Sequence, residues 1–316
     1  MASVDKVYNS DMEWLQFILA GSVVGFTVGL TGMGGGVLMT PILVLIFKVD
    51  PMAAVGSDLL VAFLMKPVGA LVHHKAGTVR WEIMKWLVPF SVPAGFAGAF
   101  LLDTLGEGED MAARLKLMIG GALLLAVVGM IAGMFVGRGR TSLRADEKLE
   151  VRPLPTALIG LFGGLVVGIT SVGSGTLIIV LLMLVYPRLR ARDLVGSDLV
   201  QAIPLVGAAT LGHLVAGNIQ FDLAGWLLIG ALPGIYFGAK YSTEIPNAVL
   251  RWVLAVLLLG SGLKLWGAPI PFVLGASIAL GIAGMEITAR RSKRPAAKRY
   301  LHATRVVRSK TPDLLD

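Results

Sequence analysis

The sequence contains no cysteine, so it can form neither a disulfide framework nor a cysteine-ligated metal site. It is also poor in charge. Asp, Glu, Lys and Arg make up 15% of its 316 residues, against about a quarter in an average soluble domain. No Gly-Lys-Ser or Gly-Lys-Thr ending follows its glycine clusters, so a phosphate-binding loop is not indicated. These absences argue against a disulfide-stabilised domain and against a nucleotide-driven machine.

Apolar sequence takes the place of charge. Hydrophobic residues make up 55% of the chain, and the mean hydropathy is +0.78. Several runs approach or reach the length that a helix needs to cross about 30 Å of hydrocarbon. They cover residues 14–28, 52–72, 83–102, 117–136, 154–169, 199–216, 223–239, 249–265 and 270–285. Since the short alternating segments of a membrane barrel are not visible, we predict an all-α polytopic membrane protein whose partner is the lipid bilayer.

The chain carries the same element twice. The pentapeptide Val-Gly-Ser-Asp-Leu occupies residues 55–59 and again 195–199, each time within an apolar run. Two further blocks recur in the same order: residues 25–36 match 164–175 at an offset of 139, and residues 73–79 match 213–219 at an offset of 140. Three matched blocks in one order predict two structural repeats, as in many secondary transporters.

Each repeat opens with an apolar helix that a glycine-rich segment interrupts, at residues 31–36 and 170–175. Glycine destabilises a helix and readily adopts positive φ, so we expect the backbone to unwind there. Three helices should follow each broken helix, and one unmatched helix should come last. The expected organisation is a first repeat at 1–136, a polar cytoplasmic connector at 137–153, a second repeat at 154–266, an extra transmembrane helix at 267–289 and a basic cytoplasmic tail at 290–316.

Basic residues orient these pieces. The connector holds five Lys/Arg, and residues 290–310 hold nine. If each broken helix returns to the side that it entered from, every basic loop lies on one side, which the positive-inside rule makes cytoplasmic. The N-terminus and the acidic loop 103–110 then face outward, and an odd number of crossings per half makes the repeats inverted. A single crossing of each broken segment would place the connector and its five basic residues outside, against this rule. The sequence leaves open whether the broken segments are re-entrant or cross the membrane twice.

These residues resemble a known family. The glycine-rich break, the following Pro41, the repeated pentapeptide, Lys66 and the segment 73–81 are similar to the sulfite exporter TauE/SafE family of membrane transporters, and the likeness runs from about residue 20 to 266. The resemblance implies a secondary transporter of sulfite, sulfonates such as sulfoacetate, or related small organic anions. The second half departs from the first, because Pro41 has no match and an apolar residue near 205–206 takes the place of Lys66.

The glycine-rich breaks are the first candidate site. Unwound backbone inside a membrane is tolerated only where it lines a cavity or is buried in protein. The helix that restarts after it presents free N–H groups and a positive dipole end to an oxyanion. The candidate anion-binding residues are Gly34, Gly35, Gly36, Gly173, Ser174 and Gly175, with Thr31, Thr170 and Ser171 as hydroxyl donors. The alternative is that these glycines only allow close helix packing.

The buried charges are the second candidate site. Asp58 and Lys66 are eight residues apart, about 80° around a helix at 100° per residue, so both can face one cavity. We expect Asp58 and Asp198 to carry a coupling proton and Lys66 to attract the anion. The polar neighbours Ser57, Ser197 and Gln201 complete the substrate-binding candidates. Capping of a helix by each aspartate is the structural alternative.

Two histidines lie at matched ends of their helices, His73 and His213, and interfacial hydrogen bonding or a proton relay would suit them. Neither has a further His or Cys at ligand spacing, so no metal site is expected. No cofactor is expected either. The basic tail lacks interleaved aromatic residues, which argues against a nucleic-acid partner.

The function predicted from the sequence is transport of small anions across the cytoplasmic (inner) membrane by alternating access. A proton or sodium gradient would drive it, and the chain would not be an enzyme. Two rivals are a cation or metal carrier that uses Asp58 and Asp198, and an intramembrane enzyme, for which Ser57 lacks a nearby base. The sequence does not fix the substrate, the direction of transport or the oligomeric state, for which a homodimer stays open.

Overall fold

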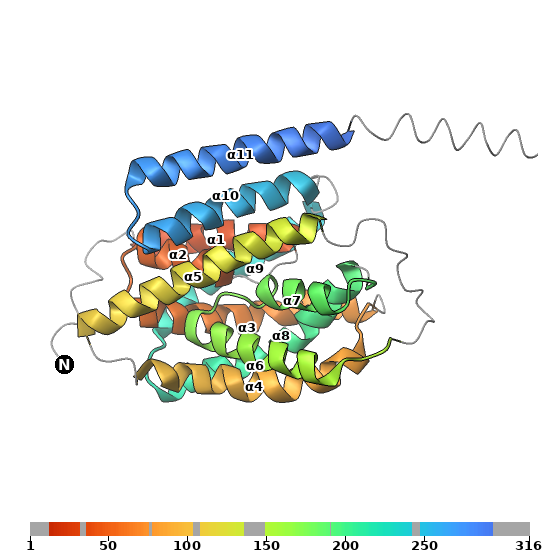
Figure 1. Ribbon diagram of the computed structural model, residues 1–316. Coiled ribbons are helices and arrows are strands. Elements are labelled where there is room, and N and C mark those ends of the chain that lie inside the picture. The colour runs from red at the N-terminus through yellow and green to blue at the C-terminus, as the bar shows by residue number, and fades with distance from the viewer. Residues whose placement is uncertain are drawn as a thin grey trace, which may run out of the picture.

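The computed structural model describes residues 13–31, 36–75, 78–103, 108–135, 149–189, 191–241 and 247–292, which form α-helices and contain no strand. The helices are α1 (Glu13–Thr31), α2 (Gly36–Leu45), α3 (Pro51–Lys75), α4 (Trp81–Asp103), α5 (Gly108–Phe135), α6 (Pro153–Thr170), α7 (Leu177–Val185), α8 (Ala191–Val215), α9 (Phe221–Tyr241), α10 (Asn247–Leu265) and α11 (Ile270–Ser292). They lie roughly side by side in one bundle (Figure 1).

The bundle has the lengths and the surface of a membrane protein. Seven of the described helices, α1, α4, α5, α6, α8, α9 and α11, are long and apolar enough to cross a bilayer. Large apolar side chains cover the outer faces, with Leu154, Val215 and Met285 each about seven-tenths exposed. Soluble proteins rarely expose apolar surface on this scale, because it would be in contact with water. The prediction of an all-α polytopic membrane protein is confirmed.

The broken helices are present where the glycines predict them. In the second half α6 ends at Thr170 and α7 begins at Leu177, and the backbone between them has positive φ at Ser171, Gly173 and Gly175. In the first half α1 ends at Thr31 and α2 begins at Gly36. The two restarting helices have 10 and 9 residues, so each rises only about 15 Å, half of a hydrocarbon core.

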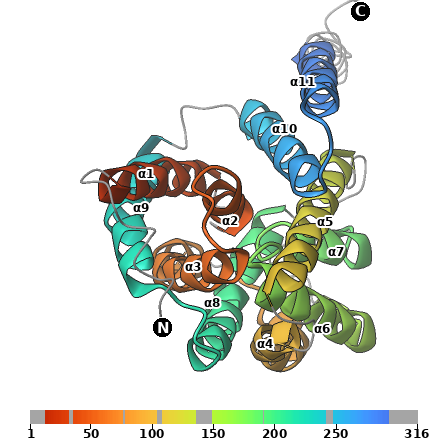
Figure 2. The same ribbon diagram turned by 90° about the vertical axis from the view of Figure 1, so that its left-hand side faces the viewer.

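Helix contacts come in matched pairs across the repeat. The helix α1 packs along α9, and its counterpart α6 packs along α4, while α3 packs on α8 and α5 on α10 (Figure 2). The extra helix α11 lies at the edge of the bundle against α10. Glycine residues allow α1 to approach α9 closely and α6 to approach α4 closely. A Cβ on Gly230 of α9 would collide with the carbonyl oxygen of Ile18 in α1, and a Cβ on Gly168 of α6 would collide with the carbonyl oxygen of Gly95 in α4.

The two central helices, α3 and α8, run antiparallel. The first residues of each helix contact the loop that follows the other helix. Ser57 near the start of α3 accepts a hydrogen bond from the Gln220 backbone N–H at 3.2 Å. Ser197 near the start of α8 accepts one from the Arg80 backbone N–H at 2.8 Å. The two bonds are equivalent under the offset of 140 residues, so each half holds the other by the same contact.

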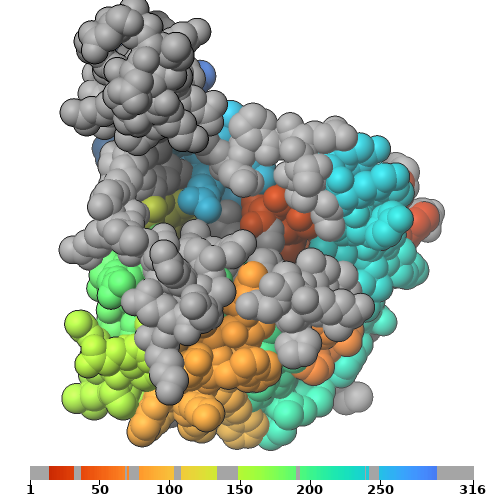
Figure 3. All heavy atoms as spheres, turned by 90° about the vertical axis from the view of Figure 1, so that its right-hand side faces the viewer, coloured from red at the N-terminus to blue at the C-terminus, as the bar shows by residue number. Residues whose placement is uncertain are grey.

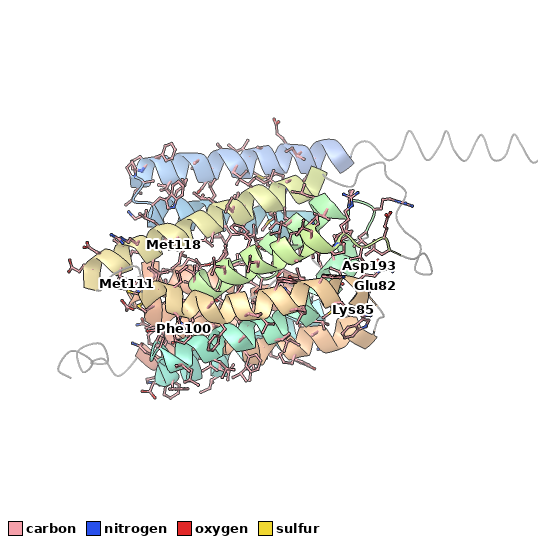
Figure 4. All side chains as sticks on the ribbon, turned by 60° about the horizontal axis from the view of Figure 1, so that its bottom comes forward. Glu82, Lys85, Phe100, Met111, Met118 and Asp193 are labelled. Carbon is pink, nitrogen blue, oxygen red and sulfur yellow. The ribbon has the colours of Figure 1, made fainter. Side chains whose placement is uncertain are left out.

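Labelled side chains mark the two ends of the bundle. Glu82, Lys85 and Asp193 gather at one end, whereas Phe100 and Met111 lie at the other (Figure 4). Figure 3 shows the first of these ends, where α4 begins in orange with the start of α6 in lime beside it. Helix α5 ends and α6 begins at this end (Figure 1), as the predicted topology requires. Which side of the membrane each end faces stays a prediction.

Candidate functional site

Asp58 lies inside α3 and is completely buried. The residue that caps α3 is Asp50, whose carboxylate accepts hydrogen bonds from the backbone N–H groups of Met52 and Ala53 at 2.9 and 3.2 Å. Asp58 instead accepts a hydrogen bond from the Thr40 hydroxyl of α2, with 2.5 Å between Oγ1 and Oδ2. The capping alternative is therefore wrong for Asp58, which joins the central helix to the half-helix after the first break.

Asp198 has the matching position in α8 and is equally buried. The Gln201 amide donates to its Oδ1 at 3.3 Å, and the Ser91 hydroxyl of α4 donates to the Gln201 carbonyl oxygen at 3.2 Å. The Gly175 backbone amide, at the second break, neighbours the same carboxylate. Asp198 therefore also joins a central helix to a broken one, although it does so through different residues.

Lys66 is a buried cation that interacts with both aspartates. Its side chain is buried, and its ammonium interacts electrostatically with both Asp58 and Asp198. The nitrogen nevertheless has no hydrogen-bond partner among the described residues. Lys66, Asp58 and Asp198 are therefore three buried ionisable groups that interact with one another, and we call them the polar centre; the role of Lys66 in binding an anion stays a prediction.

Five buried polar atoms in the described part of the chain have no hydrogen-bond partner, and they belong to this region. They are Oδ1 of Asp58, Nζ of Lys66, Oγ of Ser171, Oγ1 of Thr176 and Oδ2 of Asp198. Buried polar atoms in proteins are almost always hydrogen-bonded, so a group of exceptions needs an explanation. A polar ligand that contacts the central helices and the second break would satisfy them.

The second break supplies hydroxyl groups to this polar centre. Ser171 follows α6 in the left-handed conformation, with φ of 58°, and its side chain lies against Asp58. Thr176 precedes α7 at the N-cap position, but its hydroxyl makes no capping bond. Thr170 bonds locally to the carbonyl groups of Val166 and Val172. The Ser171 and Thr176 hydroxyl groups thus make no direct hydrogen bond to the described residues, whereas Thr170 stabilises the end of α6.

Other predicted site residues have structural partners. Ser57 and Ser197 bond to backbone groups of the opposite half, as described above. The imidazole Nε2 of His213 lies 2.8 Å from the Gly168 carbonyl oxygen of α6. Thr31 donates to the Thr27 carbonyl oxygen at 2.8 Å. The serine and histidine contacts join different parts of the bundle, whereas the Thr31 bond lies within α1. None of these four residues carries one of the five unpartnered atoms.

Some predicted residues are not described. Gly34 and Gly35 lie outside the described residues. Gly36 begins α2. His73 lies in α3, but its side chain is outside the described part of the structure. Gly173 and Gly175 provide the positive φ of the second break, and Ser174 is buried between them.

Sequence reasoning missed three side chains, Thr40, Ser91 and Thr176. Each is a buried hydroxyl residue within or beside an apolar helix. Thr40 and Thr176 follow the two glycine-rich breaks, which was the available signal. Ser91 offered none, because it reaches the site only through Gln201, 110 residues later.

Metal ligation finds no support in the described residues, where no group of three or more His, Cys, Asp or Glu side chains could hold an ion. The polar centre instead combines one cation with two carboxylates and two free hydroxyl groups. It can neutralise an anion at Lys66 and hydrogen-bond its oxygens.

Comparison with known proteins identifies the family of the chain. The sulfite exporter TauE/SafE family matches residues 17–265, which cover both repeats. The chain belongs to this family. It is 32% identical over 256 residues to the probable membrane transporter protein YjnA of Bacillus subtilis, a match that covers 79% of this chain and 99% of that protein. The family is thus one of membrane transporters, and nearly the whole length of YjnA aligns with this chain.

More distant relatives carry the same description. The probable membrane transporter protein MJ0441 of Methanocaldococcus jannaschii is 30% identical over 255 residues, covering 76% of this chain and 91% of its own length. The probable membrane transporter protein YdhB of Bacillus subtilis is 25% identical over 238 residues, covering 74% and 92%. No solved structure matches the chain.

Proposed function

We propose that this TauE/SafE protein is a secondary transporter that moves sulfite, a sulfonate or a related small organic anion across the cytoplasmic membrane. The observation that carries the proposal is the buried ammonium of Lys66, which has no hydrogen-bond partner among the described residues and interacts with two buried carboxylates. A buried cation is costly unless it is paired, so its site within the membrane is a functional candidate.

The second break is the proposed cradle for the anion's oxygens. Helix α7 begins there, and the positive end of its dipole favours an oxyanion. Ser171 and Thr176 would donate hydroxyl hydrogen bonds, while Lys66 supplies the charge. The combination of a half-helix N-terminus with free hydroxyl donors and a cation fits a sulfonate or carboxylate group.

Alternating access is the proposed mechanism. The antiparallel α3 and α8 and their reciprocal serine contacts support inverted repeats, which transporters use to open toward one side and then the other. Asp58 and Asp198 connect the central helices to the broken ones and would carry the coupling ion. We further propose that the connector and the C-terminal tail are cytoplasmic, following the positive-inside rule.

Ligand-dependent thermal stability of the purified, detergent-solubilised protein tests this function. Sulfite, thiosulfate, sulfoacetate and acetate would be added in turn, since a ligand that binds the folded state raises its melting temperature. At least one anion should stabilise the wild type and fail to stabilise Lys66→Gln. The matched control is Lys264→Gln, which changes an exposed lysine at the end of α10 and should keep the response.

A cation carrier is the second candidate, because each aspartate has one oxygen without a partner. The ammonium of Lys66, which interacts with both carboxylates, argues against it, since it would repel a metal ion. Calcium, zinc and sodium therefore belong in the same panel. Stabilisation by a cation alone, with no response to any anion, would overturn the anion proposal in favour of this one.

A further inference from the structure

We infer that the polar centre admits a singly charged oxyanion, and that each anion binds together with about one proton. The inference rests on the proposed anion transport and deepens it by naming the charge class of the substrate and what must accompany it. It follows from the charges that face one another around Lys66.

The buried charges do not balance when all three groups are ionised. Lys66 contributes one positive charge, and Asp58 and Asp198 contribute two negative charges. A monovalent anion would raise the excess to two negative charges in a region of low dielectric constant, where uncompensated charge is expensive. One proton therefore neutralises the empty centre, and a second would be needed when the anion arrives.

Among the side chains that the structure describes, the elements around the centre offer no other ionisable group for this purpose. The described residues of α2, α6 and α7 carry no Asp, Glu, His, Lys or Arg. On α4, α5 and α9, every charged side chain that the structure describes is exposed. These residues are Glu82, Lys85, Glu109, Asp110, Arg114, Lys116, Asp222 and Lys240. On α8, Asp193 pairs with Arg80 and His213 bonds to the Gly168 carbonyl group. The protons must therefore be held by Asp58 and Asp198.

The hydrogen bonds show where those protons would reside. Each carboxylate accepts a direct hydrogen bond on one oxygen, from Thr40 for Asp58 and from Gln201 for Asp198. The other oxygen makes no direct hydrogen bond to the described residues, although the Ser171 side chain neighbours Asp58 and the Gly175 backbone amide neighbours Asp198. A proton on the free oxygen turns an acceptor that would repel the anion into a donor that can bind it. The two carboxylates together hold two protons, which is enough for a monoanion and too few for a dianion.

Isothermal titration calorimetry on the full-length protein in detergent tests the inference. Methanesulfonate and acetate are singly charged between about pH 6 and pH 8, whereas sulfate carries two charges. Titrations at one pH in two buffers of different ionisation enthalpy measure the protons taken up. We expect uptake of about one proton per bound monoanion, a Kd that rises up to about tenfold per pH unit, and at least about tenfold weaker sulfate binding.

The variants Asp58→Asn and Asp198→Asn separate proton uptake from general damage. Asparagine keeps an oxygen for Thr40 or Gln201 but is permanently neutral, as the protonated carboxyl group would be. At least one variant should bind methanesulfonate at pH 8 as tightly as wild type or more tightly, with a weaker dependence of Kd on pH. Asp222→Asn, at an exposed aspartate in the first turn of α9, should leave the Kd and its pH dependence unchanged.

The outcomes distinguish this inference from the function on which it rests. If neither the monoanions nor sulfate bind, both the anion site and the proton linkage are wrong. If a monoanion binds through Lys66 without proton uptake, or sulfate binds equally well, the transport proposal stands and the proton linkage is wrong. Weaker binding at pH 8 in both Asn variants would also overturn it.

Discussion

At the scale of single residues, Lys66 is the cation around which the polar centre is arranged. Loss of one charge-assisted contact costs roughly 1.5–3 kcal/mol, so Lys66→Gln should weaken anion binding about tenfold to a hundredfold. Binding would be measured by titration calorimetry on folded, detergent-purified protein. Unchanged affinity would leave Lys66 as a structural partner of the two aspartates, and Lys264→Gln provides the comparison.

Thr176 gives a sharper test, because its buried hydroxyl makes no hydrogen bond to the described residues. Thr176→Val removes the hydroxyl and keeps the shape of the side chain. We expect the melting temperature to stay the same or rise, since an unsatisfied buried donor is costly, while anion affinity falls about fivefold to tenfold for one lost hydrogen bond of about 1 kcal/mol.

The matched control for this prediction is Thr210→Val. Thr210 is also buried, but its hydroxyl donates to the Val206 carbonyl oxygen within α8 at 2.8 Å. Its replacement should leave anion affinity unchanged. Equal losses of affinity in the two variants would indicate a general structural effect and remove Thr176 from the site.

At the scale of elements, the long contact between α1 and α9 depends on small residues, as is common for helices in a bilayer. A Cβ on Gly230 would collide with the Ile18 carbonyl oxygen, whereas one on Gly225 of the same helix would meet nothing within 4 Å. Overpacking typically costs 1–3 kcal/mol, so Gly230→Ala should lower the melting temperature by roughly several degrees. Gly225→Ala should not lower it, and similar melting temperatures in the two variants would contradict the close approach of α1 and α9.

The link between the halves is a second feature at this scale. The Arg80 guanidinium forms an ion pair with Asp193 at 3.2 Å, and the side chains are 11% and 3% exposed. The same link donates the backbone hydrogen bond to Ser197. In the other half Gln220 takes the place of Arg80. The ion pair therefore strengthens only one of the two serine–loop contacts that are otherwise equivalent between the halves.

A double-mutant cycle measures this contact. Arg80→Gln, Asp193→Asn and the double variant would be unfolded in mixed detergent micelles, and the coupling free energy calculated from the four values. We expect about 1–3 kcal/mol, above the value for an exposed pair because both groups are largely buried. A coupling energy near zero would show that the pair does not hold the two halves together.

At the scale of the whole molecule, the predicted topology can be tested by labelling cysteines in intact cells. The chain has no cysteine, so single substitutions need no background changes. Glu107→Cys should react with a membrane-impermeant maleimide, and Arg144→Cys should react only after the membrane is permeabilised. External labelling at position 144 would place the connector outside and overturn the inverted-repeat topology.

The sequence by itself determined the membrane class, the broken helices and the duplication. Apolar runs of the required length, glycine clusters within them and matched blocks are all properties of neighbouring residues or of the chain compared with itself. The predicted breaks at residues 31–36 and 170–175 therefore agree with the ends of α1 and α6 and the starts of α2 and α7 to within about two residues. The charged residues of the site were also visible, because an ionisable side chain stands out in an apolar run.

Only the tertiary structure decided which residues meet. Asp58 is bonded to Thr40, 18 residues before it, and Gln201 to Ser91, 110 residues before it. Ser57 belongs to a contact with Gln220, 163 residues away, although its position beside Asp58 suggested a role in the site. Local sequence cannot encode such partners, because they depend on how the central helices pack against the opposite half. The sequence therefore identified the charged residues of the site, and helix packing determined which hydroxyl groups lie near them without a hydrogen-bond partner among the described residues.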